Sequence, residues 1–142
     1  MARIVLTNVG VVIGAVDLSD HVASVTISST YDVLETTAFA GGNVPQAAKT
    51  RIAGLVDNSV TLEFHQDFAA GEVEQSIYPL LGTSVACSIK PLTDSAPAAD
   101  NPAYQFNALI SEWTPLNGAV GELATASVTW PISGAITKDV TP

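Results

Sequence analysis

The chain has 142 residues, the length of one domain, which can bury roughly 68% of its unfolded surface and form a core without a metal or a disulfide. Charged residues make up only 13% of the chain, about half the usual share, so small and apolar side chains must cover much of the surface, as in proteins that associate with their own copies. Fourteen acidic residues against five Lys and Arg give a net charge of −9 and no basic stripe for phosphates, which argues against a nucleic-acid-binding protein.

The excess of carboxylates has two interpretations. Acidic charge keeps small domains soluble, and composition alone favours this explanation. Alternatively, some carboxylates line a surface that repels a polyanion. The two interpretations differ in where the carboxylates lie in the folded protein.

The first third of the chain is dominated by a period of two, which predicts β-strands. Residues 2–7 and 9–16 are rich in Val and Ile, and residues 17–20 (Asp-Leu-Ser-Asp) form a turn in which Asp and Ser side chains bond the nearby backbone. Residues 21–28 and 31–37 are two further strand candidates.

Neither the first apolar run nor the single cysteine indicates secretion. Residues 9–16 fall far short of the ~20 residues of a membrane helix, and Asn8 and β-branched residues do not suit a signal peptide. Cys87 cannot form an intrachain disulfide and is expected to be a small core residue. We expect a soluble protein that folds in the cytoplasm, with no membrane insertion.

Residues 38–57 interrupt the strand pattern and predict a long loop. Gly41, Gly42, Asn43 and Pro45 are turn formers, and Lys49 and Arg51 are two of the five positive residues of the chain. A disordered linker would be polar, but this segment is not. Its apolar side chains are Phe39, Val44, Ile52, Leu55 and Val56. Either the core of the domain or a neighbouring subunit must cover them.

The middle of the chain contains the clearest strand and the only good helix. In residues 58–67, Val60, Leu62 and Phe64 alternate with polar residues, which predicts one buried and one solvated face. Residues 70–81 carry an apolar stripe at helical spacing and end at Gly82, although Pro79 indicates a distorted last turn.

The last third predicts three more strands. They span residues 84–90, 104–114 and 121–132, separated by a mobile, exposed loop at residues 91–102 and by a turn at residues 115–118. Residues 133–142 are expected to form a polar, extended tail. Together these elements predict a mainly β fold: one domain over residues 1–142, a β-sandwich or open barrel with one flanking α-helix and a long extended loop.

The sequence carries no recognisable catalytic or cofactor motif. His21 and His65 are the only histidines, and neither lies in a nucleophile signature. Zinc motifs need close pairs of Cys or His, and calcium loops need a run of oxygen ligands, and the sequence has neither. We therefore expect no enzyme activity, no metal and no cofactor.

Four segments together resemble the tail tube (major tail) proteins of long-tailed bacteriophages. They are V-D-L-S-D-H-V at residues 16–22, T-T-A-F followed by R-I-A-G-L at residues 36–55, S-V-T-L-E-F-H-Q-D-F at residues 59–68, and T-A-S-V-T-W-P at residues 125–131. Each is weak alone, and their order and spacing make the resemblance more specific. It spans about residues 8–137.

The resemblance implies a structural subunit that self-assembles into stacked hexameric rings, forming the tail tube of a virion. Other partners would be a tape-measure protein, tail-end adaptors and DNA that passes to the host without specific binding. Residues 38–57 would then be an arm that reaches a neighbouring subunit. Its expected contact residues are Phe39, Gly41, Gly42, Lys49, Arg51, Ile52 and Leu55. Glu35 and Glu63 are candidates for carboxylates that face the channel.

Two other classes of function stay open at this stage. A capsid decoration protein, a tail adaptor or minor tail protein, or an immunoglobulin-like interaction module would be a monomer or small oligomer in which residues 38–57 form a self-contained loop. A small hydrolase would need a pocket centred on His21 or His65.

Overall fold

The computed structural model describes residues 3–42 and 44–141 of the chain. Ala2, Asn43 and Pro142, which the sequence assigns to a strand, a turn and the tail, lie outside the described residues. The strands are β1 (Gly10–Ile13), β2 (Val16–Asp17), β3 (Val22–Glu35), β4 (Arg51–His65), β5 (Ser84–Lys90), β6 (Ala103–Leu109) and β7 (Thr125–Asp139). The α-helix is α1 (Val73–Ile77), and two 3₁₀ turns span Ser19–His21 and Tyr78–Leu80.

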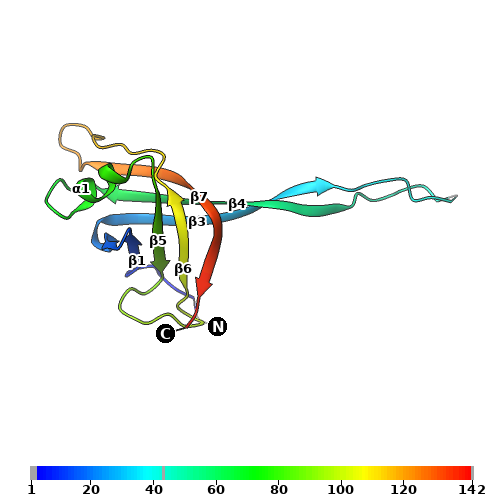
Figure 1. The fold of residues 1–142 in the computed structure, drawn as a ribbon, viewed down its shortest axis with the longest axis horizontal. Helices are drawn as coiled ribbons and strands as arrows, with labels where there is room; N and C mark the ends of the chain where they lie inside the picture. Colours follow the sequence, from blue (N-terminus) through cyan, green and yellow to red (C-terminus); the bar gives the residue numbers. More distant parts are fainter. Residues whose placement is uncertain (1–2, 43, 142) are drawn as a thin grey trace.

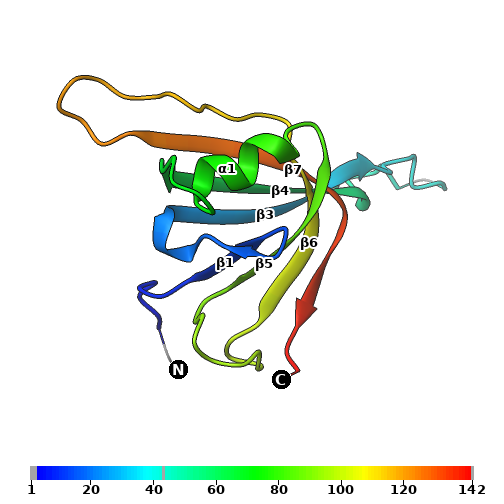
Figure 2. The ribbon, with the colours of Figure 1, turned by 60° about the vertical axis from the view of Figure 1, so that its left-hand side comes forward.

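The strands form one antiparallel sheet in the order β2-β1-β5-β6-β7-β4-β3. Strand β7 pairs with β4 through residues 125–131 and with β6 through residues 132–139. The sheet therefore has two layers: β3, β4 and the first half of β7 form one, and β2, β1, β5, β6 and the second half of β7 form the other (Figure 2). Gly134 lies in this crossing segment with φ +88°, a conformation that favours glycine. Its carbonyl accepts a hydrogen bond of 3.0 Å from the buried Asn58 amide. The predicted mainly β fold with a flanking helix is confirmed.

A single hydrophobic core fills the space between the two layers. Its largest fully buried side chains are Trp130 and Phe64, whose ring centroids lie 6.3 Å apart. Trp113 approaches Phe64 edge-on at 5.6 Å, a favourable arrangement for aromatic rings. The buried faces that alternation predicts in residues 58–67 and 84–90 are confirmed, including the burial of Cys87.

The N-terminal segment differs from its prediction. Residues 3–7 are not a strand, because no other strand pairs with them, and Ile4, Val5 and Leu6 are exposed. The run at residues 9–16 is a short hairpin, β1 and β2, joined by a turn at Gly14 and Ala15. The predicted Asp-Ser turn is present: Asp17 accepts a hydrogen bond of 3.0 Å from the Ser19 backbone amide.

The central strands are longer than the sequence predicts. The two candidates at residues 21–28 and 31–37 form the single strand β3, and β4 begins at Arg51. The prediction of a loop over residues 38–57 is therefore wrong for residues 51–57, which pair with β3. Twelve residue pairs join β3 and β4, and this pairing holds Gly54 and Ala53 in a strand although neither favours one.

The helix is shorter than residues 70–81. Gly71 has φ +77°, and α1 begins only at Val73. Beyond Ile77 the chain tightens into the 3₁₀ turn that contains Pro79, as expected for a residue that cannot continue an α-helix. No helix in the described part of the chain has the length and apolar character of a membrane span.

The loop at residues 91–102 and the C-terminal segment make contacts that the sequence does not predict. Asn101 is buried and bonds the backbone of Leu92, Ser95 and Ala96, which braces the loop at residues 91–102, and Asp94 and Asp100 of this loop are exposed as predicted. Residues 133–139 of the predicted extended tail continue β7 and pair with β6, so the strand is longer than predicted.

Candidate assembly interface

The β3–β4 hairpin extends far beyond the rest of the molecule (Figure 1). We call residues 31–56 the arm and the remainder the body. The arm consists of the ends of β3 and β4, in which Leu34 pairs with Ile52 and Glu35 with Arg51, and of the loop between them, whose described residues (36–42 and 44–50) form no strand. The Thr50 amide donates to the Thr37 hydroxyl (2.9 Å), and the Thr36 amide to the Thr50 carbonyl (2.8 Å), which close the base of this loop.

A bulge between Tyr31 and Val33 marks the start of the arm. Gly54 lies opposite, and a Cβ there would stand 3.1 Å from Asp32 Cβ and 3.4 Å from Leu34. A larger residue at position 54 would press against both neighbours, so glycine lets the two strands stay close. At the tip, Gly41 and Gly42 have φ of +81° and +62°, and a Cβ added at either position would meet no other atom within 4 Å.

The arm exposes apolar side chains that the body does not cover. Phe39 is fully exposed, and Leu55 is 82% exposed. Tyr31, Val33, Leu34, Val44, Ile52 and Val56 are also exposed. The sequence left two ways to cover Phe39, Ile52 and Leu55, the core of the domain or a neighbouring subunit. Because all three side chains are exposed, the core of this subunit does not cover them. Contiguous apolar surface of this kind marks interaction sites in soluble proteins.

The charges of the arm differ in their surroundings. Lys49 Nζ lies 3.7 Å from Glu35 Oε1, and because both side chains are more than half exposed, this pair contributes little to stability. Arg51 is exposed and forms no ion pair with the residues that the structure describes. The arm therefore presents a cation beside its apolar side chains.

The outer face of β3, β4 and β7 is covered by hydroxyl groups. Across this face Thr26 pairs with Thr61, and Thr61 with Thr129, whose hydroxyl lies 3.1 Å from that of Thr61. The face, which we call the hydroxyl face, consists of Ser24, Thr26, Ser28, Thr30, Asp57, Ser59, Thr61, Glu63, Ser127 and Thr129. These ten residues include two carboxylates and neither Lys nor Arg.

The two carboxylates that the sequence assigns to a channel are not brought together. Glu63 lies on the hydroxyl face, opposite Ser24 and Ser127, and is exposed. Glu35 lies on the arm, beside Lys49. Asp57, which the sequence did not single out, shares the hydroxyl face with Glu63; period-two counting along β4 from Glu63 would have found it.

The end of the body away from the arm gathers the 3₁₀ turn at Ser19–His21, residues 66–72, α1 and the loop at residues 110–124 (Figure 1). We call it the α1 end. Hydrogen bonds connect its segments: Trp113 Nε1 donates to Glu74 (2.7 Å), and Gln66 donates to Glu74 (3.0 Å) and to the Pro115 carbonyl (2.9 Å). These contacts join segments distant in sequence, so no local pattern predicts them.

His21 connects three carboxylates at the α1 end. Its Nδ1 lies 2.8 Å from Asp20 and 3.5 Å from Glu72, and its Nε2 lies 2.9 Å from Asp67. Partial burial works against protonation, but the hydrogen bonds to Asp20 and Asp67 outweigh it and raise the pKa of His21. Asp20, His21 and Glu72 each offer a donor atom within 4.8 Å of the others, yet both ring nitrogens already bond carboxylates. In this arrangement His21 cross-links the 3₁₀ turn at Ser19–His21 to residues 66–72.

We predict that His21→Gln removes a pH dependence of stability. A raised pKa in the folded state contributes stability below the unfolded value of 6.5, and this contribution is lost as the pH rises through the folded value. Hydrogen bonds from the Ala69 amide and His21 lower the pKa of Asp67 below its ordinary 3.8, so Asp67 loses its contribution only in acid. Urea midpoints between about pH 5 and about pH 8 should therefore fall for the wild type and stay flat for His21→Gln. Equal slopes for both proteins would contradict this role.

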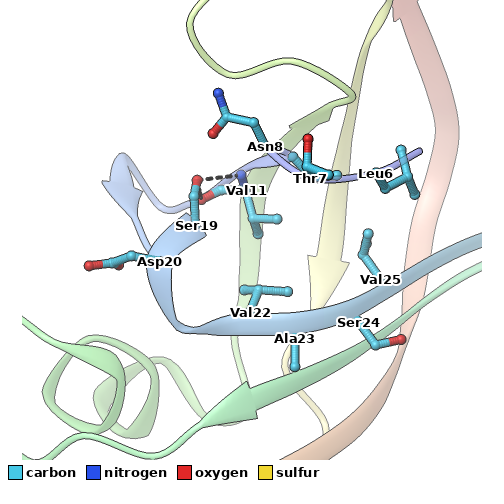
Figure 3. A pocket seen from close by; sticks show the side chains of 11 residues that line it. Leu6, Thr7, Asn8, Val11, Ser19, Asp20, Val22, Ala23, Ser24 and Val25 are labelled. Atoms are coloured by element: carbon cyan, nitrogen blue, oxygen red, sulfur yellow. Dashed lines mark hydrogen bonds between the residues drawn. The ribbon is translucent and has the colours of Figure 1, made fainter. Parts of the chain in front are cut away.

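A cleft of about 470 Å³ lies between the N-terminal segment and β3 (Figure 3). Three residues that line the cleft carry hydroxyl groups: Thr7, Ser19 and Ser24. The Ser19 hydroxyl accepts a hydrogen bond of 2.8 Å from the Val11 amide and also bonds Asp17. Neither His21 nor His65 lines the cleft. The cleft therefore does not place a hydroxyl group beside either histidine, as the hydrolase hypothesis requires.

Comparison with solved structures shows the same fold in chains of gene transfer agent particles. A chain in the structure of the virion of a native gene transfer agent particle superposes with a TM-score of 0.67 and 11% identity, over 94% of this chain and 96% of that one. A chain in the C6-symmetric tail of an empty gene transfer agent particle gives a TM-score of 0.62 and 12% identity, over 84% and 83%. No family model and no curated protein sequence matches this chain. At this identity the likeness establishes the fold, which is tail-tube-like.

Proposed function

We propose that this chain is a non-enzymatic structural subunit that assembles into six-membered rings, and that the rings stack into the tail tube of a virion. The observation that carries the proposal is the likeness, over nearly the whole chain, to chains of a gene transfer agent virion and of a C6-symmetric tail. The exposed arm adds support, because it offers apolar surface that only another molecule can cover.

In this proposal the arm makes the contacts between subunits. Phe39, Ile52 and Leu55 are its apolar anchors, and Gly41 and Gly42 shape its tip. The chain is made in the host cytoplasm and functions in the virion. Its other partners are a tape-measure protein and tail-end adaptors, with DNA in transit.

The hydroxyl face is the surface best suited to line the channel. Duplex DNA binds to proteins chiefly through Lys and Arg at its phosphates, and this face has neither. Glu63 and Asp57 add negative charge that repels phosphate. Glu35 is less suited, because Lys49 neutralises it on the arm.

The direct test is negative-stain electron microscopy of the concentrated protein together with sizing chromatography. We expect rings or tubes with a central hole and sixfold end views. A protein that stays monomeric, alone and with the other tail proteins added, would instead indicate a decoration, adaptor or immunoglobulin-like module.

The proposed lining predicts the effect of Thr61→Lys combined with Glu63→Lys. Tubes of this variant should retain short duplex DNA that wild-type tubes release, and the retention should fall steeply with salt as counterions compete. Co-sedimentation of DNA with tubes measures it. The matched control is Ser95→Lys with Asp100→Lys, which changes the net charge by the same amount at two exposed positions on the loop at residues 91–102. Equal retention by both variants would show that the hydroxyl face does not line the channel.

A further inference from the structure

The loop at residues 110–124 exposes apolar side chains at the α1 end. Leu116 is 83% exposed, Leu123 is 65% exposed, and Val120 is fully exposed. The loop is held in place at its base, where the Gln66 amide donates to the Ala124 carbonyl (3.0 Å) and Trp130 Nε1 donates to the Glu112 carbonyl (2.9 Å). An ordered loop with a bare apolar tip is a second surface that needs a partner.

The α1 end is acidic, whereas the arm carries no net charge, because Asp32 and Glu35 balance Lys49 and Arg51. The segments that form the α1 end carry Asp20, Asp67, Glu72, Glu74, Glu112 and Glu122 and contain no Lys or Arg. The five Lys and Arg of the chain are Arg3, Lys49, Arg51, Lys90 and Lys138, and two of them are on the arm. Arg51 forms no ion pair with the residues that the structure describes, so the arm offers this one cation to the acidic α1 end, and both surfaces expose apolar side chains.

The two surfaces also lie at opposite ends of the molecule. The arm continues the direction of β3 and β4 on one side of the body, and the α1 end lies at the other end of the same strands (Figure 1). A contact between two different surfaces is heterologous, and it generates an open stack when the rotation between the two copies does not close into a ring. Contact between two arms would instead close into a dimer.

Resting on the proposed tube function, we infer that the α1 end is the docking surface for the arm of a second copy of this chain. The apolar tip of the arm packs against Leu116 and Val120 of the next copy. Arg51 faces carboxylates of that copy, of which Glu122 is the exposed one beside Val120. Subunits of successive rings are thus joined head to tail.

A charge exchange tests this contact. Arg51→Glu and Glu122→Arg should each raise the protein concentration needed for tube formation about tenfold, as expected for losing a charge pair worth about 1.4 kcal/mol. The double variant restores the pair in every interface and should assemble near the wild-type concentration. The matched control joins Arg51→Glu with Asp100→Arg, which reverses an exposed carboxylate outside the α1 end and should not rescue assembly. Rescue by the control, or none by the double variant, would overturn the inference.

Cysteine cross-linking provides an independent measurement. Burial raises the pKa of the native Cys87 thiol to about 11, so this thiol does not compete under mild oxidation. Chains that carry one cysteine at Phe39 or Val44 and one at Leu116, Val120 or Leu123 should form ladders of covalent multimers within tubes. Single-cysteine variants, and Phe39→Cys with Val140→Cys, should form none.

The outcomes separate the two proposals. Tubes confirmed by microscopy in which no pair cross-links would overturn the docking surface and leave the tube subunit intact. Wild-type protein that forms no tubes with or without the other tail proteins would overturn the proposed function itself.

Discussion

Replacing residues 36–50 by a two-residue Asn-Gly turn should abolish tube formation and leave the body folded. The replaced segment lies beyond the last strand pair, Glu35 with Arg51, and contains Phe39, Val44 and Lys49. These side chains are exposed, so their removal takes nothing from the core. The chain should keep its thermal midpoint within a few degrees, because changes to exposed segments usually alter stability by about 0.5 kcal/mol or less and a shorter loop loses less entropy on folding.

Two measurements decide this prediction. Circular dichroism melting reports the folding of the shortened chain, and sizing chromatography with electron microscopy reports its assembly. The control is Asp94→Ala with Asp100→Ala, at exposed positions of the loop at residues 91–102 and outside both proposed contact surfaces, which should leave folding and assembly unchanged. Long tubes formed by the chain without residues 36–50 would contradict a role of the arm in tube formation. A molten or unfolded product would show that the arm stabilises the body.

The buried faces of the strands could be predicted from the sequence, whereas the ends of the strands could not. Val60, Leu62 and Phe64 alternate with polar residues, and alternation is a local property of a half-buried strand. The segment at residues 51–57 contains Gly54 and lacks that pattern, because both of its faces are exposed on the arm. Its strand structure comes from pairing with β3, some twenty residues earlier, and no local pattern records this pairing.

The candidate interface could be predicted only in part, because only the arm is formed by residues that are close together in the sequence. The apolar side chains at residues 38–57 stood out against a background of turn formers, which indicated that something must cover them. The α1 end gave no comparable signal. Its segments are separated by up to a hundred residues, and only folding brings His21 to Asp67 and Trp113 to Glu74. A cluster of charge that is assembled in space cannot be read from spacing along the chain.

Trp130→Ala should destabilise the body by about 3–5 kcal/mol, the usual cost of removing a large buried aromatic side chain. Trp130 is fully buried between the layers, beside Phe64, and its indole Nε1 also donates to the Glu112 carbonyl. The substitution therefore leaves a cavity and also frees the base of the loop at residues 110–124. Since small domains are stable by about 5–15 kcal/mol, this loss is a large share of the total.

Urea unfolding of purified monomer measures the loss of stability. A second variant, Trp130→Phe, isolates the lost hydrogen bond, and Leu109→Ala serves as the control. Trp130→Phe keeps most of the ring and loses the Nε1 donor, so it should cost about 1–3 kcal/mol for the carbonyl left without its partner. Leu109→Ala, at a half-exposed position of β6, should cost no more than about 1 kcal/mol. Equal losses for Trp130→Ala and Leu109→Ala would contradict the place of Trp130 at the centre of the core. The arm contributes no residue to that core. Trp130→Ala should therefore lower the urea midpoint while the protein that stays folded still forms tubes. The chain with the shortened arm should form no tubes and keep an unchanged midpoint.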